Sequence, residues 1–324
     1  MANQSKGVAF SRNPIVKFVK TNLAMLIGLI VMYIIFAVCN DKFFTVSNFI
    51  NVLRQISINS IVAFGMTYAI LITGIDLSVG SIMAVTGCLS VLMIVNGISI
   101  PIAFAAALVL GIIIGFINGF IIAKGQMPAF IVTLAMLTIA RGSAYLMTGG
   151  KPTRISLPAF ENIGNGYLGP IPIPVIITII CLILASLLLN RTIFGRNVYA
   201  IGGNREAAKF SGINIDKVEI AVYAISGFLA SLAGVIVAAR LSSAQPTAGE
   251  GQELDAIAAV VLGGTSFSGG YGKIGGTMIG ALIIGFLSNG LNMIQVNFYW
   301  QLVVKGIVIL AAVYFDTFKK RNKA

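Results

Sequence analysis

Long apolar stretches, separated by short polar ones, run through almost the whole chain. Four of the clearest cover residues 23–39, 100–122, 173–189 and 274–294. As a helix, a stretch of about 20 apolar residues spans the roughly 30 Å hydrocarbon core of a bilayer. Lipid offers no hydrogen-bond partner to a bare backbone, so such stretches must be helical. The pattern therefore predicts an all-α fold, a polytopic bundle of transmembrane helices.

About ten membrane spans can be placed on this pattern. They lie in a transmembrane domain over residues 21–315, preceded by a short segment (1–20) and followed by a basic tail (316–324). The predicted spans cover residues 21–39, 56–73, 79–95, 100–122, 128–148, 171–189, 219–239, 254–268, 274–294 and 298–315.

The composition agrees with a membrane protein and argues against an enzyme. Hydrophobic residues make up 57% of the chain and charged residues 10%, whereas a soluble domain carries about 25% charged residues. The chain has no histidine, and histidine is the commonest metal ligand and a frequent general base. The ten acidic residues are scattered mostly over loops. We therefore expect no catalytic residue, no metal site and no cofactor.

The net charge of +12 is distributed unevenly between the two sides of the predicted bundle. With the N-terminus inside, fifteen basic residues fall on the cytoplasmic side and five on the outer side, a strong positive-inside bias. The bias predicts cytoplasmic N- and C-termini in the cell (inner) membrane. It also accounts for the basic charge without nucleic-acid binding. The inner set is Lys6, Arg12, Lys17, Lys20, Lys124, Arg191, Arg196, Arg205, Lys209, Lys217, Lys273, Lys319, Lys320, Arg321 and Lys323, and the outer set is Lys42, Arg54, Lys151, Arg154 and Arg240.

Two polar, glycine-containing interruptions break the apolar pattern, at residues 71–81 and 263–270. Glycine loosens a helix, and broken backbone at membrane depth is tolerated only when it is buried in protein or lines a wet cavity. Each interruption is therefore either a tight turn at the membrane edge or an element that lines a path through the bundle.

Isolated polar residues inside the predicted spans are candidates for a solute path or for bridges between helices. Arg141 and Lys305 should face protein or water, or extend to the membrane interface. Arg141 has either a structural tie, to a backbone carbonyl or to Asp76, or a role in substrate binding. Glycines at four-residue spacing (Gly111, Gly115, Gly119 and Gly276, Gly280) mark close helix contacts. The candidate path residues are Asn59, Thr73, Asp76, Ser78, Asn118, Asn289 and Asn292.

The longest inner loop, residues 190–217, contains the pattern of a short capped helix. Asn204 suits an N-cap, Glu206 lies in the first turn where the helix dipole favours an acidic side chain, and Gly212 suits a C-cap. These residues predict a surface helix of about two turns on the cytoplasmic side.

At this point the chain resembles a known family. The run Glu-Ala-Ala-x-x-x-Gly-Ile from Glu206 to Ile213 resembles the coupling-loop motif of ABC importer permeases. The resemblance continues through GIDLSVGS (74–81), RLSSAQPTAGEGQELDAIAAVVLGGTSFSGG (240–270) and the glycine-rich pattern of 276–292. Together these segments resemble the monosaccharide permeases of that family, and among them the ribose permeases most closely, over roughly residues 20–318.

The resemblance implies a permease subunit that moves a monosaccharide, ribose before other sugars, while a separate subunit hydrolyses ATP. It implies three protein partners: a second copy of the permease with the path at the interface, a cytoplasmic ABC ATPase and an extracytoplasmic sugar-binding protein. Membrane lipid surrounds the complex. The residues that the resemblance assigns to ATPase coupling are Asn204, Glu206, Ala207, Ala208, Gly212 and Ile213.

The residues leave one rival in place, an ion-coupled secondary sugar transporter. Such transporters commonly relay ions through intramembrane carboxylates or histidines. This chain offers only Asp76 near membrane depth. Sugar uptake that survives an uncoupler and fails without ATP separates the two mechanisms.

Overall fold

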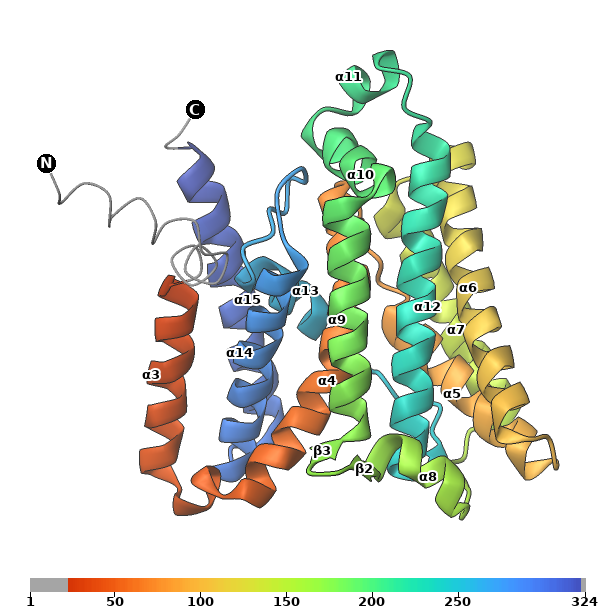
Figure 1. Cartoon of the computed structure of the whole chain (residues 1–324), viewed down its shortest axis with the longest axis vertical. Helices are drawn as coiled ribbons and strands as arrows, with labels where there is room; N and C mark the ends of the chain where they lie inside the picture. The colour runs from red at the N-terminus through yellow and green to blue at the C-terminus, as the bar shows by residue number, and fades with distance from the viewer. Residues whose placement is uncertain (1–22, 322–324) are drawn as a thin grey trace, which may run out of the picture.

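The computed structural model describes residues 23–321. The predicted N-terminal segment (1–20) and the last residues of the predicted tail (322–324) lie outside this range. The described chain is a bundle of helices with four two-residue strands (Figure 1). In chain order the elements are α3 (Leu23–Cys39), η1 (Asp41–Phe44), α4 (Val46–Leu71), α5 (Val79–Val95), α6 (Ile100–Gly125), α7 (Ala129–Thr148), β1 (Thr153–Arg154), α8 (Pro158–Asn165), β2 (Tyr167–Leu168), β3 (Ile171–Pro172), α9 (Ile173–Arg191), α10 (Ile193–Gly203), α11 (Arg205–Phe210), α12 (Ile215–Leu241), β4 (Ser243–Ala244), α13 (Gln252–Leu262), α14 (Ile274–Met293) and α15 (Phe298–Arg321).

Six helices within the described range are long and apolar enough to cross a membrane: α4, α6, α7, α9, α12 and α14. Shorter apolar helices lie in α3, α5 and α15. The predicted polytopic helical bundle is thereby confirmed. Helix α4 begins ten residues earlier than the predicted span 56–73, because Thr45 caps it through the Asn48 N–H and the polar first turns remain helical.

The predicted span 254–268 is wrong. Helix α13 has only eleven residues, which corresponds to about 16 Å at 1.5 Å per residue and cannot cross the hydrocarbon core. Gly263 ends the helix and Gly264 follows with φ +78°. The chain that leads into α13, residues 245–251, is irregular and contains Pro246 and two glycines with positive φ, Gly249 and Gly251.

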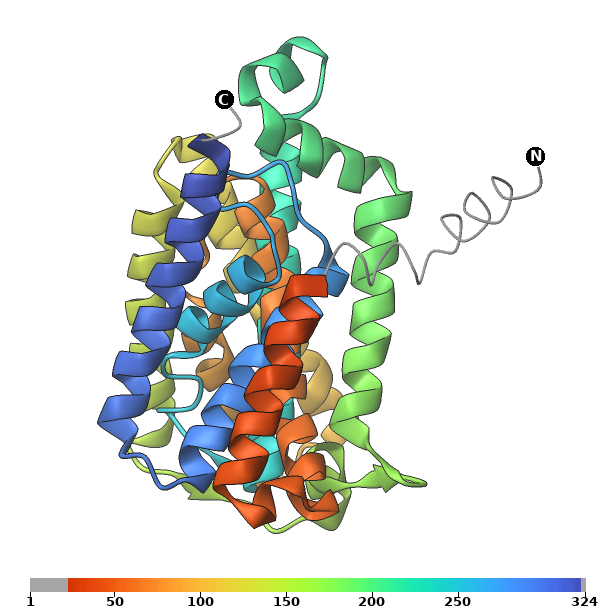
Figure 2. The same cartoon turned by 90° about the vertical axis from the view of Figure 1, so that its left-hand side faces the viewer.

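Helices α4, α12 and α14 form the inside of the bundle, and α6, α7 and α9 form its outside. In an apolar 18-residue segment of each inner helix, 67% of the residues are buried. The corresponding share is 28% in α6 and α9 and 22% in α7. The outer helices therefore present apolar side chains to the surroundings, as membrane-spanning helices do. Figure 2 shows the same arrangement after a quarter turn.

Close glycine contacts fix the inner helices. A Cβ added to Gly115 of α6 would lie 2.2 Å from the Tyr223 carbonyl oxygen of α12, and one added to Gly111 would meet Ser231. A Cβ on Gly280 of α14 would lie 1.9 Å from the Ala259 carbonyl oxygen of α13. The two predicted glycine rows are therefore helix contacts, α6 against α12 and α14 against α13.

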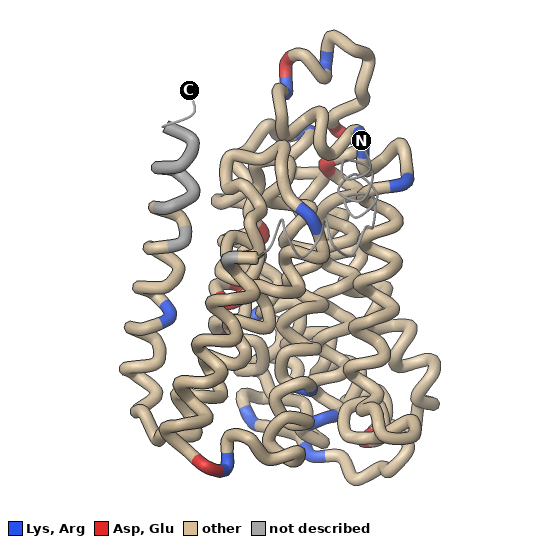
Figure 3. Tube along the Cα trace, turned by 60° about the vertical axis from the view of Figure 1, so that its left-hand side comes forward, with Lys and Arg blue, Asp and Glu red and all other residues tan. Residues whose placement is uncertain are grey.

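The bundle has two different ends. Helices α10 and α11 form one end, which we call the α11 end, and α8 with the pair β2–β3 forms the other, the α8 end (Figure 1). The first turn of α3 and the last turn of α15 both lie toward the α11 end. Charged residues gather mainly near the two ends, with few between them (Figure 3).

Candidate functional site

Helix α11 is a short helix with a complete cap at each end. The Asn204 side chain accepts a hydrogen bond from the Ala207 N–H at 2.9 Å. At the other end Gly212 takes φ +80°, and the Ile213 N–H donates to the Ala208 carbonyl at 3.1 Å. This 6→1 bond with a left-handed glycine is a Schellman motif, which needs glycine for its geometry. The predicted two-turn capped helix is confirmed.

The residues of α11 divide into an exposed face and an anchored face. Glu206, Ala207 and Lys209 are exposed, and Phe210 has 87% of its surface exposed. Ala208 is buried, at 4% exposure. Phe210 is thus an exposed apolar side chain on a helix that lies outside the apolar bundle.

A half-buried ion pair ties α11 to α12. Arg205 makes a two-pronged salt bridge to Glu219, with Nη2 to Oε2 at 3.1 Å, and the Glu219 side chain is 5% exposed. Hydrogen bonding to Glu219 raises the pKa of Arg205. A bidentate pair of this kind fixes orientation as well as position. The pair therefore fixes α11 against the start of α12.

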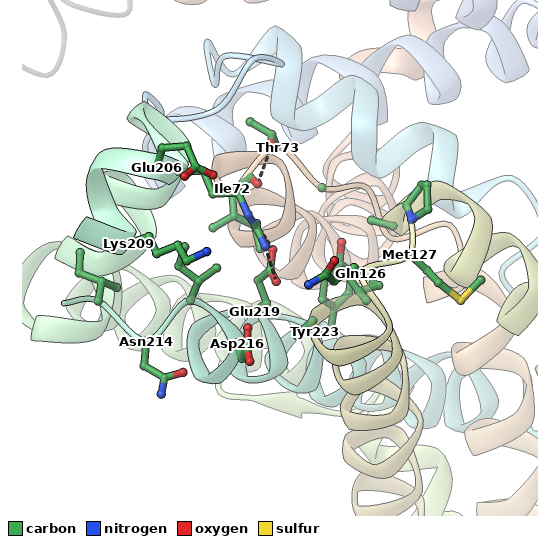
Figure 4. A pocket seen from close by; sticks show the side chains of 18 residues that line it. Ile72, Thr73, Gln126, Met127, Glu206, Lys209, Asn214, Asp216, Glu219 and Tyr223 are labelled. Carbon is green, nitrogen blue, oxygen red and sulfur yellow. Dashed lines mark hydrogen bonds and ion pairs between the residues drawn. The ribbon is translucent and has the colours of Figure 1, made fainter. Parts of the chain in front are cut away.

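A cavity of about 740 Å³ opens beneath α11 (Figure 4). It reaches from Glu206 and Lys209 of α11 to the α6–α7 turn at Gln126 and inward to Thr73 and Tyr223. The Tyr223 hydroxyl at its inner wall is buried and has no hydrogen-bond partner in the described chain. The cavity thus joins the exposed α11 surface to the first predicted interruption.

That first interruption is a stretch of non-helical chain between α4 and α5, in which Asp76 and Ser78 are buried and Thr73 is exposed. Thr73 takes φ +66°, and its hydroxyl donates to the Ile72 carbonyl. Asp76 is fully buried, and its carboxylate accepts from the Ser78 N–H at 3.0 Å and from the Ser226 hydroxyl of α12 at 2.7 Å. The Ser78 hydroxyl donates to the same carboxylate.

Three predicted path residues meet at this point. Asn118 of α6 donates from Nδ2 to the Ser78 hydroxyl at 2.9 Å, which joins it to Asp76. The Asn118 Oδ1 atom is buried without a partner in the described chain. We call these residues the buried polar cluster: Asp76, Ser78, Asn118 and Ser226. Among the described residues, no Lys or Arg forms an ion pair with the Asp76 carboxylate.

A further non-helical stretch, which the sequence pattern did not predict, starts from the α8 end. Strand β4 pairs with β1, and residues 245–251 then continue inward to the start of α13. Arg141 of α7 holds this stretch: its Nη1 donates to the Pro246 carbonyl at 2.6 Å and to the Ala248 carbonyl at 2.7 Å. The expected tie of Arg141 is therefore made to backbone carbonyls, and not to Asp76.

The two broken stretches touch at Gly80 and Gly249. A Cβ added to Gly80 would lie 2.2 Å from the Gly249 carbonyl oxygen and 2.5 Å from Glu253 Oε2. A Cβ on Gly249 would lie 2.5 Å from the Gly80 carbonyl oxygen. One stretch enters from the α11 end and continues as α5, and the other enters from the α8 end and continues as α13. Paired discontinuous helices of this kind are typical of transporter substrate sites.

The glycine-rich stretch 263–270 is a turn at the α11 end. The Gly270 N–H donates to the Leu71 carbonyl at 2.9 Å, where α4 ends, and Gly202 of α10 packs against the same carbonyl. The Tyr199 hydroxyl of α10 donates to the Gly272 carbonyl at 2.7 Å. Of the two readings of this interruption, the geometry favours the turn.

The remaining polar residues of the predicted spans lie apart from the buried polar cluster. Asn289 of α14 pairs with Asn48 of α4, at 3.0 Å from Nδ2 to Oδ1. Asn292 accepts from Gln301 of α15 at 2.8 Å. Lys305 pairs with Asp255 of α13 at 2.8 Å. Each of these contacts bridges two helices.

The sequence alone did not show the surroundings of Asn59 or the role of Ser226. Asn59 is buried in α4, and its Oδ1 has no partner in the described chain. Ser226 was not predicted, because a single serine within an apolar helix has no distinguishing signal. The Arg205–Glu219 pair was also missed, although a glutamate just inside a predicted span is a detectable sign of a buried partner.

Comparison with known proteins agrees with this architecture. The family model described as "Branched-chain amino acid transport system / permease component" matches residues 48–313. The chain belongs to this permease family. The permease is 48% identical over 301 residues to the ribose import permease protein RbsC of Haemophilus influenzae, with 92% of this chain and 93% of the relative covered.

Two further relatives are also ribose import permeases named RbsC. The permease is 50% identical over 299 residues to the RbsC protein of Escherichia coli (strain K12), covering 91% of this chain and 93% of the relative. It is 49% identical over 300 residues to the RbsC protein of Bacillus subtilis, covering 92% and 93%. No solved structure matches the chain significantly. The family resemblance of the sequence is confirmed, and the permease is a multi-pass protein of the cytoplasmic membrane.

Proposed function

We propose that this chain is the membrane-spanning subunit of an ATP-driven importer that carries a monosaccharide, ribose before other sugars, into the cell. The observation that carries the proposal is the near-50% identity to ribose import permeases from three organisms over more than 90% of each chain. ATP hydrolysis belongs to a separate ABC ATPase subunit in this proposal, and an extracytoplasmic sugar-binding protein delivers the sugar.

The proposed topology has ten crossings, with both termini and the α11 end in the cytoplasm. Eight crossings are single helices, and two are the broken crossings 72–95 and 243–262. The positive-inside bias of the sequence supports this orientation. Support also comes from α3 and α15, whose free ends lie toward the same end as α11.

Helix α11 is the proposed ATPase contact, with Asn204, Glu206, Ala207, Ala208, Gly212 and Ile213 as the coupling residues. Its exposed Phe210 and its salt bridge to α12 support this role, since a docked partner could move α12 through Arg205 and Glu219. A second copy of the permease, implied by the family resemblance, remains part of the proposal.

The proposed sugar path uses the predicted residues Asn59, Thr73, Asp76, Ser78, Asn118, Asn289 and Asn292. The strongest support concerns Asp76, Ser78 and Asn118, which share one buried polar cluster beside the broken stretches. The cluster residues are buried within one chain, so contact with a sugar that passes at the interface of two copies requires the Gly80–Gly249 contact to open. Such a change needs only two packings that differ by a few kcal/mol.

Import into proteoliposomes tests the proposal. The permease, its ATPase partner and the sugar-binding protein are reconstituted, and radiolabelled ribose uptake is measured with ATP inside and without an ion gradient. We expect uptake that requires ATP and persists with an uncoupler. Uptake that is driven by a proton or sodium gradient without ATP would identify the chain as a secondary transporter.

The C-cap of α11 gives a specific prediction. Gly212→Val should lower ribose-stimulated ATP turnover about tenfold while leaving membrane insertion intact, because a β-branched residue strains the φ +80° position and misdirects α11. ATPase assays of the purified complex measure the effect. The matched control is Gly203→Val, where an added Cβ meets nothing within 4 Å and φ is not positive. Normal coupling in the Gly212 variant would remove α11 from the proposed mechanism.

A further inference from the structure

A second cavity, of about 360 Å³, lies on the other side of the Gly80–Gly249 contact from the cavity beneath α11. Gln55 of α4, Arg240 of α12 and Gln252 of α13 line it, and Met83 of α5 forms part of its apolar wall. Its volume is within the range of small-molecule sites, roughly 300–1,000 Å³.

The polar side chains of this cavity are free to bind a ligand. Gln55, Arg240 and Gln252 make no side-chain hydrogen bond or ion pair within the described residues. The Gln252 Oε1 atom is buried without a partner in that part of the chain. A buried polar atom with no partner costs about 1–3 kcal/mol, so the Gln252 Oε1 atom favours an occupant. The exposed Gln55 and the half-buried Arg240 line the same cavity and can bind that occupant as well.

The chemistry of the three side chains indicates what the occupant must offer. The Arg240 guanidinium is a donor only, whereas each glutamine amide both donates and accepts. The buried Gln252 Oε1 needs a donor, which a carboxylate cannot supply and a hydroxyl group can. A sugar hydroxyl donates and accepts, and the methylene and sulfur surface of Met83 can cover the apolar face of a sugar ring.

The position of the cavity adds an independent argument. Gln252 is the first residue of α13, the half-helix of the second broken crossing. Half-helix ends near the middle of a membrane protein are where transporters bind substrate. Gly249, which contacts Gly80, also lines the cavity, so its occupant would lie directly against the closed contact between the two broken stretches.

We propose that Gln55, Arg240 and Gln252 form an outer monosaccharide subsite, where the sugar binds after delivery and before the Gly80–Gly249 contact opens. This inference rests on the proposed function and adds to it a binding site that the predicted path residues do not include. Arg54 donates to the Asn165 carbonyl at 2.7 Å and lies over the Tyr167 ring. It does not line the cavity and is not part of the subsite.

The test uses two leucine variants, Gln55→Leu and Gln252→Leu, in the reconstituted complex of permease, ATPase and sugar-binding protein. Leucine is close in size to glutamine, and its side chain cannot form a hydrogen bond to a sugar. We expect ribose imported per ATP hydrolysed to fall about tenfold in Gln252→Leu, where a hydrogen bond at a buried atom is lost, and about threefold in Gln55→Leu, whose side chain is exposed. Gln55 is exposed on α4, so its variant folds even if Gln252→Leu does not. Asn51→Leu, one turn earlier on the same helix and exposed, is the matched control.

A second measurement separates the subsite from a docking contact. The affinity of the sugar-binding protein for the permease should be unchanged in both variants. Affinity that falls together with import would mean that the cavity receives a side chain of the delivery protein, and it would overturn the subsite. Unchanged import in Gln55→Leu would overturn it as well. Ribose uptake by the wild-type complex that does not depend on ATP would instead contradict the proposed function itself.

Discussion

Gly80→Ala is expected to abolish ribose import and to lower the stability of the permease by about 3 kcal/mol, the upper range for forcing extra volume into a packed interior. The new methyl group would lie 2.2 Å from the Gly249 carbonyl oxygen. That atom belongs to backbone that Arg141 holds through the neighbouring Pro246 and Ala248 carbonyls. The strain therefore cannot be relieved by rotating a side chain.

Thermal unfolding in detergent and uptake in proteoliposomes measure the two effects. The control is Gly142→Ala on α7, where an added Cβ meets nothing within 4 Å and where alanine favours the helix by up to about 1 kcal/mol. The control should keep full import and equal or higher stability. Wild-type import in the Gly80 variant would show that the two broken stretches do not need their close contact.

Asp76→Ala is expected to stop import and to cost about 3 kcal/mol of stability, because buried donors left unsatisfied cost about 1–3 kcal/mol each. The carboxylate accepts from the Ser78 N–H, the Ser78 hydroxyl and the Ser226 hydroxyl, and alanine leaves all three donors without it. The link from the first broken stretch to α12 is lost at the same time.

Asp76→Asn distinguishes a structural carboxylate from an ion relay. The asparagine Oδ1 can keep both bonds from Ser78, and its amide can donate to the Ser226 hydroxyl oxygen, so we expect at least half of wild-type import. Ribose uptake and ATP turnover of the asparagine variant are measured side by side. Complete loss of import with intact folding would indicate that the negative charge itself is needed, as in an ion-coupled transporter.

The long helices could be predicted because lipid permits few alternatives for an apolar stretch. The caps of α11 could also be predicted, since Asn204 and Gly212 act on their own neighbours in the chain. The glycine rows indicated close contacts, and only the fold revealed that Gly115 packs on α12 and Gly280 on α13.

The second broken crossing could not be recognised from average hydropathy. The apolar run 256–262 resembles part of a span, and its short length is visible only when Pro246, Gly249 and Gly251 are read as a break before it. The partnership of Asp76 with Ser226 depends on two segments 150 residues apart in the chain. Contacts of this kind follow from tertiary packing, for which a single sequence gives no local signal.

ATP-driven import through this permease requires α11 to lie on the cytoplasmic side, where an ATPase can reach it. A Lys209→Cys variant, with Cys39, Cys88 and Cys181 replaced by serine or alanine, tests this in sealed vesicles of known orientation with a membrane-impermeant thiol reagent. Lys209 is exposed on α11, so we expect labelling from the cytoplasmic face only and protection when the ATPase subunit is bound. Labelling from the outer face would contradict the topology, the coupling role of α11 and the direction of transport together.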